Sequence, residues 1–199
     1  MSQCSTPTAP SSRRRSNTVN SGKPFEYELG RSLTHFGETH PGFFWRRWPD
    51  FQDFSREAKY HAPRAPSDFI TLYRGTFTAI EAKSTRGTRF RMSWLKPHQR
   101  RSLLEVKAAG GISYLAFNHR SKPFRCWFID ISDYLRLEKE FSSDGMKSVP
   151  ITAISKIGTE VSRINIKNSG MTRGAKGWRL SPVLELRESL TSYNAGEKI

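Results

Sequence analysis

The chain has 199 residues and a formal net charge of +15, from 33 Lys and Arg against 18 Asp and Glu. This length suits one α/β domain with its own core and excludes two large domains. The positive charge favours a polyanionic partner such as DNA, with an anionic membrane surface or a ribosomal role as alternatives, and indicates nothing about the fold.

The cysteine content and the hydropathy pattern exclude other classes of protein. Cys4 and Cys126 are the two cysteines, which is neither a disulfide framework nor a zinc-site spacing and fits a reducing compartment. No apolar run approaches the roughly 18 residues of a membrane span. The N-terminus lacks the apolar core of a signal peptide.

The first 21 residues differ in composition from the rest. Residues 1–21 are rich in Ser, Thr, Pro and Asn and contain the triplet Arg13–Arg15. This composition predicts a disordered basic tail, whose arginines either contact DNA non-specifically or are simply solvated. We expect residues 22–199 to form a single domain.

Lys23–Phe36 has the apolar periodicity of a helix. The apolar positions at helical spacing are Phe25, Leu29, Leu33 and Phe36. Glu26 follows the first of them directly, so it lies at the edge of the buried stripe, from which a side chain can reach a cleft. Glu28 is interpreted as a surface acid near the positive end of the helix dipole.

Gly42–Trp48 alternates aromatic and basic residues. We interpret it as the first core strand, with Phe43, Trp45 and Arg47 on one face, and we expect Arg46 and Arg47 to contact DNA as well. The segment at about 49–64 follows it. Its polar residues that lie near the candidate site in sequence are Asp50, Asp53, His61 and Arg64, of which His61 is interpreted as an ordinary loop residue.

The stretch Asp68–Tyr73 and the stretch Thr76–Lys83 predict a β-hairpin with Arg74–Gly75 as its turn. This register places Asp68 opposite Glu81, and like charges at directly opposed positions repel. Side chains alternate along a strand, so Lys83 shares the face of Glu81. A divalent cation such as Mg²⁺ would remove the repulsion. The alternative is a set of solvated strand charges with Lys83 as their ion-pair partner.

Basic and hydroxyl residues follow this hairpin. Arg86, Arg89 and Arg91 surround a short turn, and guanidinium groups pair with phosphate through two hydrogen bonds. Thr85 can donate a hydrogen bond to phosphate. The alternative is a solvated basic loop.

Leu95–Ala109 predicts a helix that ends at Gly110–Gly111. Its expected apolar stripe comprises Leu103, Leu104, Val106 and Ala108. His98 and Gln99 lie in the first turn, and a lone His serves as a general base less often than as a structural hydrogen-bonding group. His98 is therefore interpreted as a structural hydrogen-bonding residue.

The remaining segments extend the same pattern. Ile112–Asn118 and Phe124–Ile131 predict two antiparallel core strands joined by a basic turn at His119–Pro123. Ser132–Phe141 predicts an amphipathic helix with Ser132 as its N-cap. The basic extension at about 142–199 is expected to complete the sheet, form a dimer arm or line a DNA groove, and the composition of its Gly170–Gly177 stretch predicts a mobile segment.

The arrangement Pro-x-Asp, hairpin, Glu-x-Lys, formed here by Pro66, Asp68, Glu81 and Lys83, resembles the core of the PD-(D/E)xK nuclease superfamily. The longer stretch 67–117 resembles the RecU-type Holliday junction resolvases. In that family a similar hairpin leads to a helix containing His-Gln and to a strand that begins Gly-Gly-Ile.

This resemblance implies an α/β nuclease domain with a restriction-endonuclease-like (αβββαβ) core, a central mixed sheet flanked by helices. It implies metal ligation by Glu26, Asp68 and Glu81, with Mg²⁺ as the cofactor and Mn²⁺ as a substitute. Glu26 enters through the pattern G-x-x-F-E in the first helix. Lys83 and Gln99 would complete the catalytic set by orienting water or phosphate.

The implied function is an endonuclease that resolves four-way junctions by paired symmetric nicks during homologous recombination and DNA repair, acting as a homodimer. The expected location is the cytoplasm with the nucleoid, the host cytoplasm for a phage protein, or an organelle. The alternatives are a less selective restriction-like or branched-DNA repair nuclease on the same core and a catalytically silent basic DNA-binding module. The segment at about 49–64 would be a shortened form of the stalk found in this family.

Overall fold

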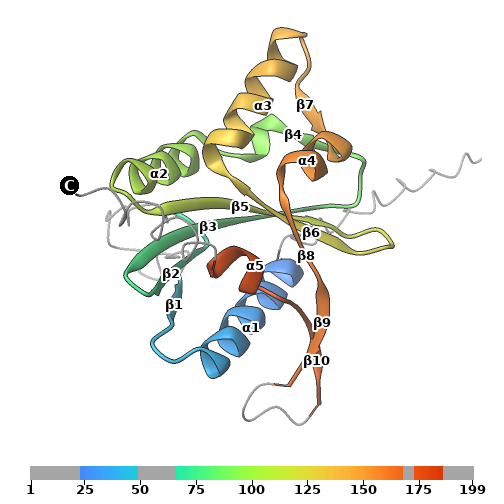
Figure 1. The fold of residues 1–199 in the computed structure, drawn as a ribbon. Coiled ribbons are helices and arrows are strands. Elements are labelled where there is room, and N and C mark those ends of the chain that lie inside the picture. The colour runs from blue at the N-terminus through green and yellow to red at the C-terminus, as the bar shows by residue number, and fades with distance from the viewer. Residues whose placement is uncertain (1–22, 49–65, 168–172, 186–199) are drawn as a thin grey trace, which may run out of the picture.

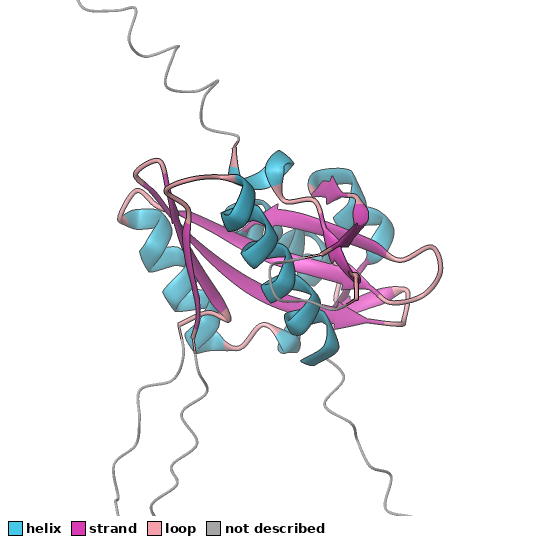
Figure 2. Cartoon of the chain, turned by 90° about the horizontal axis from the view of Figure 1, so that it is seen from below, coloured by secondary structure: helices cyan, strands magenta, loops and turns pink. Residues whose placement is uncertain are grey.

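The computed structural model describes residues 23–48, 66–167 and 173–185. Within them a six-stranded mixed sheet carries helices on both of its faces (Figures 1 and 2). The tail expected at 1–21 lies outside the described residues, and so do the site candidates Asp50, Asp53, His61 and Arg64. No helix in the described ranges is long and apolar enough to cross a membrane.

The elements follow the expected order of helix, strand, hairpin, helix, strand, strand. The helices are α1 (Lys23–Thr39), α2 (Pro97–Ala108), α3 (Ile131–Ser143), α4 (Ile151–Ile157) and α5 (Ser181–Leu184), with a 3₁₀ turn at Met92–Trp94. The strands are β1 (Phe44–Arg47), β2 (Phe69–Tyr73), β3 (Thr76–Thr85), β4 (Arg89–Arg91), β5 (Ile112–His119), β6 (Arg125–Asp130), β7 (Ser148–Pro150), β8 (Thr159–Val161), β9 (Arg163–Ile166) and β10 (Ala175–Trp178).

The main sheet has the strand order β1-β2-β3-β5-β6-β8. Its β3–β5 pair is parallel, and its other pairs are antiparallel. The chain between β3 and β5 crosses one face of the sheet and contains α2, as a parallel connection requires. Strands β4 and β7 pair separately above that face, and β9 and β10 form a hairpin beside α1 (Figure 1).

Helix α1 anchors one of the two cores. The predicted stripe is buried as expected, and the helix runs beyond Phe36 to Thr39. Each fully buried side chain of this size contributes about 1.5–3 kcal/mol. The same core includes Ile80 and Ala82 of β3, whereas Leu115 and Phe117 of β5 belong to the core beneath α2 and α3.

The β2–β3 hairpin has the predicted register, with Phe69 paired to Ile80 and Tyr73 paired to Thr76. Arg74 and Gly75 both have positive φ angles, 49° and 74°. Two such residues make the type I′ turn that matches the twist of a hairpin. Strand β3 continues to Thr85, two residues past the predicted end.

Two details of the predicted helices were wrong. In α2 Leu103 is buried as expected, but Leu104 and Ala108 are exposed, because only one narrow side of this helix lies on the sheet. In α3 the N-cap is Asp130 rather than Ser132, since the Asp130 carboxylate accepts the Ser132 N–H at 2.8 Å.

The end of α2 confirms the predicted glycine stop. Gly110 has a φ of 84°, and a Cβ on Gly111 would lie 2.8 Å from Val106 Cγ1 and 3.0 Å from the Phe77 carbonyl oxygen. The first glycine therefore turns the chain, and the second permits its close approach to β3.

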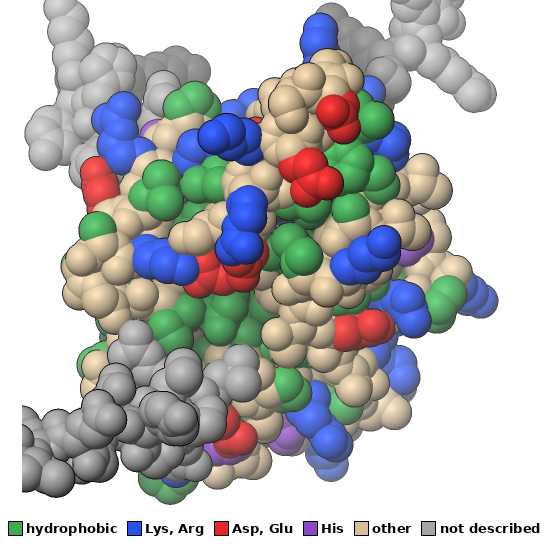
Figure 3. Space-filling model, turned by 45° about the horizontal axis from the view of Figure 1, so that its top comes forward, with side chains coloured by type: hydrophobic (Ala, Val, Ile, Leu, Met, Phe, Trp, Pro, Cys, Tyr) green, Lys and Arg blue, Asp and Glu red, His purple; other side chains and the backbone are tan. Residues whose placement is uncertain are grey.

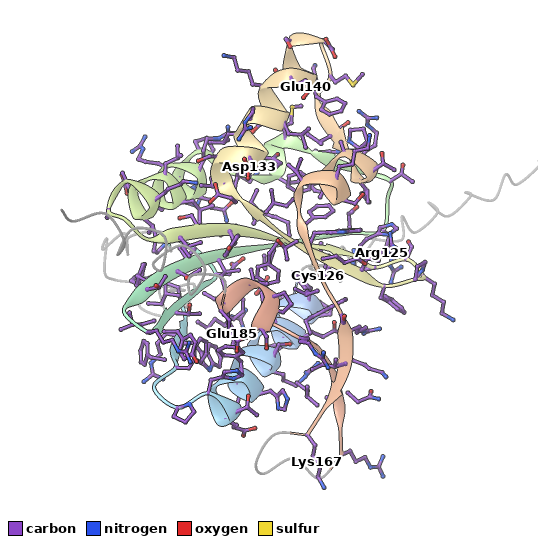
Figure 4. The ribbon with its side chains drawn as sticks, viewed as in Figure 1. Arg125, Cys126, Asp133, Glu140, Lys167 and Glu185 are labelled. Carbon is purple, nitrogen blue, oxygen red and sulfur yellow. The ribbon has the colours of Figure 1, made fainter. Side chains whose placement is uncertain are left out.

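The edge strands differ from the sequence interpretation. Strand β1 is an edge strand with Phe44 exposed, and only one face, which carries Trp45, packs against the core. Strand β8 completes the sheet at the other edge. The stretch expected to be mobile includes Ala175–Gly177, which lies in β10, where the Trp178 N–H donates to Ser32 Oγ at 2.8 Å. Cys126, labelled in Figure 4, is buried in β6.

Candidate active site

The candidate site lies where β3 extends beyond β2. Strands β2 and β3 pair as far as Ile80. Beyond that residue, the segment from Glu81 to Thr85 pairs with β5 and has no β2 partner. Asp68 directly precedes β2, and its Oδ2 accepts the Ala82 backbone N–H at 2.7 Å. The carboxylate thus replaces the missing strand partner at Ala82, and this contact fixes Asp68 beside Glu81.

Glu81 is 1% exposed and is held through one of its oxygens. Its Oε1 accepts hydrogen bonds from Lys83 Nζ at 2.5 Å and from the Gln99 amide nitrogen. Gln99 Oε1 in turn accepts from Lys83 Nζ at 3.2 Å and from the Lys96 backbone N–H at 3.0 Å. The first turn of α2 is therefore tied directly to the charged residues of β3.

The electrostatics of Glu81 reflect a buried carboxyl group beside a second one. Burial and then the charge of Asp68 raise the pKa of Glu81 from 4.5 to about 8, although Lys83 acts in the opposite direction. Burial penalises the ionised form of a carboxyl group, and a nearby like charge adds to that penalty.

The donor set fits a hard divalent cation. Glu81 Oε2 is buried and has no hydrogen-bond donor among the described residues, and the Asp68 carboxyl group is near enough to share a proton with Glu81. Two acceptor groups that face each other need a proton or a cation between them. Mg²⁺ is commonly held by one or two carboxylates together with water and substrate phosphate.

A cleft of about 420 Å³ opens beside this set of residues. It is lined by residues of α1, of β3 and of the segments before α2 and after β5: Glu26, Ala82, Lys83, Ser84, Thr85, Trp94, Lys96 and Arg120. Glu26 therefore reaches the cleft, as its position beside the apolar stripe predicted. Its carboxylate forms an ion pair with Arg47 of β1, whereas the Glu28 carboxylate pairs with Arg163 of β9 at 2.7 Å.

The structure brings together four of the five predicted catalytic residues, namely Asp68, Glu81, Lys83 and Gln99. Within the described ranges no three His, Cys, Asp or Glu side chains converge closely enough to hold a metal ion. Ligation by Glu26 therefore remains a prediction, and the ion pair with Arg47 is made through one of the two Glu26 carboxylate oxygens.

The residues predicted to bind DNA have varied surroundings. Arg46 lies over the Phe44 ring at 5.3 Å, and Arg89 donates to the Ser148 carbonyl at 2.7 Å. Arg86 and Arg91 are exposed, whereas Thr85 is buried and its Oγ1 accepts the Gly87 N–H at 3.0 Å. Figure 3 shows Lys and Arg side chains dispersed over the upper face of the molecule, with acidic side chains between some of them. DNA contact by these residues remains a prediction.

Three cleft residues were not singled out from the sequence: Trp94, Lys96 and Arg120. Arg120 lies in the turn His119–Pro123, which the sequence marks only as basic. The available signal was its position directly after a strand, because side chains at the carboxyl ends of adjacent parallel strands meet at one edge of a sheet.

Comparison with known proteins gives a consistent picture. The family model described as Recombination protein U matches residues 50–169, a range that contains Asp68, Glu81, Lys83 and Gln99 and begins after Glu26. A protein of Mycoplasmopsis pulmonis (strain UAB CTIP), named Holliday junction resolvase RecU, is 30% identical over 94 residues, which are 47% of this chain and 55% of the relative. The chain therefore spans about half the length of that relative.

A solved structure was also matched. The structure of Hjc, a Holliday junction resolvase of Archaeoglobus fulgidus, aligns with a TM-score of 0.36 and 18% identity, covering 56% of this chain and 78% of that one.

Proposed function

The chain belongs to the Recombination protein U family, whose model matches more than half of its residues, and on that basis we propose that it is a metal-dependent endonuclease acting on four-way DNA junctions. The observation that carries the proposal is the pair of carboxyl groups formed by the half-buried Asp68 and the buried Glu81. Lys83 donates to Glu81, and the second Glu81 oxygen lacks a donor among the described residues.

The chemistry is hydrolysis of a DNA phosphodiester bond. A divalent cation, either Mg²⁺ or Mn²⁺, would lower the pKa of a coordinated water and stabilise the negative charge on the phosphate oxygens. Asp68 and Glu81 are the residues that would hold it, with Glu26, which also pairs with Arg47, as a third ligand.

Lys83 and Gln99 have separate tasks in this proposal. The Lys83 ammonium group, fixed by Glu81 and Gln99, orients the attacking water or neutralises the negative charge that develops on the phosphate. Gln99 holds Lys83 and Glu81 in one geometry, since its amide donates to Glu81 and its carbonyl accepts from Lys83. A fixed geometry of this kind lowers the cost of reorganisation during the reaction.

The junction substrate suggests the form of the active assembly. A four-way junction has two-fold symmetry, so paired symmetric nicks require two active sites related in the same way. A C₂ homodimer supplies them. Such an enzyme works where DNA recombines, with the nucleoid in a bacterial cytoplasm, in the host cytoplasm or in an organelle.

The test separates binding from cleavage. Asp68→Asn and Lys83→Ala should abolish Mg²⁺-dependent cleavage of a synthetic junction while they leave junction affinity within a few-fold of wild type, because affinity depends on dispersed basic contacts. Glu140→Gln, on an exposed turn of α3, is the matched control and should cleave normally. Cleavage retained by either site variant would contradict the assignment.

Two other outcomes would identify different functions. Equal cleavage of linear duplex and junction would indicate a less selective nuclease built on the same residues. Tight junction binding without cleavage under any divalent metal would indicate a DNA-binding module that has lost catalysis.

A further inference from the structure

Arg120 is a partly buried cation whose surroundings do not neutralise it. Its Nε is buried without a hydrogen-bond acceptor, and no ion pair joins Arg120 to a carboxylate among the described residues. In contrast, the nearby Arg125 at the start of β6 pairs with Glu160 at 3.2 Å. An unpaired cation removed from water is costly unless an anion compensates it.

A second arginine adds to this cost. Burial and then the positive charge of Arg86 lower the pKa of Arg120. Two guanidinium groups held close together repel, and an anion placed between them would convert that repulsion into attraction.

The backbone holds both arginines in place. The Arg120 N–H donates to the Thr85 carbonyl at 2.8 Å, and Ser121 Oγ donates to the Arg86 carbonyl at 3.0 Å. These contacts join the turn after β5 to the turn after β3, where Thr85 pairs with His119. The backbone segments that carry the two arginines are therefore positioned by the sheet before any ligand binds, which lowers the ordering cost of binding.

The position of Arg120 relates it to the candidate active site. Arg120 lines the same cleft as Lys83 and Glu26, and Lys96 and Trp94 also border it. Two residues lie between Lys83 and Arg86 in the sequence, so their Cα atoms are about 10 Å apart along an extended strand.

We propose that Arg120 and Arg86 form a clamp for one backbone phosphate of the DNA strand that enters the cleft, beside the phosphate that is cut. The proposal rests on the proposed function for its ligand, a DNA phosphodiester. The clamp holds the strand at a fixed distance from Asp68 and Glu81, so it sets which phosphate reaches them. Guanidinium groups suit this task because they pair with phosphate oxygens through two parallel hydrogen bonds.

The test uses junction binding in chelator, where cleavage does not interfere. Arg120→Ala should weaken the affinity about tenfold and lower the slope of log affinity against log salt by about one phosphate contact. Arg125→Ala, which removes an exposed arginine from the same β5–β6 hairpin (Figure 4), is the matched control and should bind like wild type. Arg120→Lys keeps the charge and a similar stem, and it should recover only part of the affinity.

A set of junctions, each with one uncharged methylphosphonate linkage near the branch point, locates the contact. At one position, the uncharged linkage should lower the junction affinity of wild type and of Arg125→Ala about tenfold. The same linkage should not lower the affinity of Arg120→Ala any further. Normal affinity of Arg120→Ala, or full sensitivity of that variant to the same linkage, would overturn the clamp. If one linkage affects wild type and not Arg120→Ala, but Mg²⁺ produces no cleavage, the clamp is supported and the nuclease proposal fails. If Mg²⁺ produces cleavage but no linkage behaves in this way, the nuclease proposal is supported and the clamp fails.

Discussion

Replacing Glu81 with Gln should make the metal-free protein more resistant to unfolding as the pH rises. The pKa of Glu81 is raised from 4.5 to about 8 by burial and by Asp68. A carboxyl group with a raised folded-state pKa contributes stability that is fully present below pH 4.5 and is lost as the pH rises through about 8. A glutamine side chain cannot ionise, so the Glu81→Gln variant does not lose this contribution.

The magnitude follows from the same shift. At about 1.4 kcal/mol per pH unit, the wild type should lose about 3 kcal/mol relative to Glu81→Gln between pH 5 and pH 8. The variant also loses the Lys83–Glu81 contact, which shifts its free energy of unfolding by a similar amount at each pH and leaves the pH dependence as the quantity to compare. Glu81 is 1% exposed, so solvent screening does not reduce this value substantially.

The assay is urea unfolding at pH 5, 6, 7 and 8 in chelator, with Glu140→Gln as the control for loss of an exposed carboxylate. The free energies of unfolding of wild type and Glu81→Gln should diverge with pH, and those of wild type and Glu140→Gln should stay parallel. Added Mg²⁺ at pH 8 should stabilise wild type and not Glu81→Gln. Parallel curves for Glu81→Gln and wild type would refute the reasoning.

Three further substitutions, with Leu104→Ala as a control, test the scaffold of the site through the free energy of unfolding in urea. Arg74→Asn should stabilise the hairpin by about 0.5–1 kcal/mol, because Asn-Gly suits the type I′ turn better than Arg-Gly; an unchanged midpoint would contradict the turn assignment. Gly111→Ala should destabilise by about 1–3 kcal/mol, since its Cβ would lie 3.0 Å from the Phe77 carbonyl oxygen. Leu103→Ala should lower the free energy of unfolding by about 2–5 kcal/mol, because Leu103 is fully buried on the side of α2 that faces the sheet. Leu104→Ala, on the exposed side of the same helix, should lower it by less than about 1 kcal/mol.

Local patterns predicted the hairpin and much of the site, because turn chemistry fixes the register and the register fixes which side chains are neighbours. Arg74–Gly75 sets the pairing of Phe69 with Ile80, and continuing that register by one step brings Asp68 to Glu81. The position of Gln99 near the active site was expected only from the family resemblance, and its contact with Lys83 was not predicted. It depends on how α2 crosses the sheet, which periodicity does not specify.

What the sequence did not predict depends on contacts between distant segments. Arg120 reaches the cleft because β5 lies parallel to β3. Its position directly after a predicted strand was visible in the sequence, but the local pattern does not report which strands are neighbours. The contact of Glu26 with Arg47 similarly depends on where α1 packs relative to an edge strand. The exposure of Leu104 was missed because helical periodicity identifies apolar positions but not the width of the face that the sheet covers.

The most direct test of the central claim is cleavage of a synthetic mobile four-way junction beside a matched linear duplex, with each strand labelled in turn, in Mg²⁺ and in chelator. The account predicts paired, symmetric nicks on the junction in Mg²⁺, little cleavage of the duplex, and none of either substrate in chelator. Cleavage that persists in chelator, or a junction that is bound and left intact in Mg²⁺, would contradict the claim that the carboxyl pair Asp68 and Glu81 holds a catalytic metal ion.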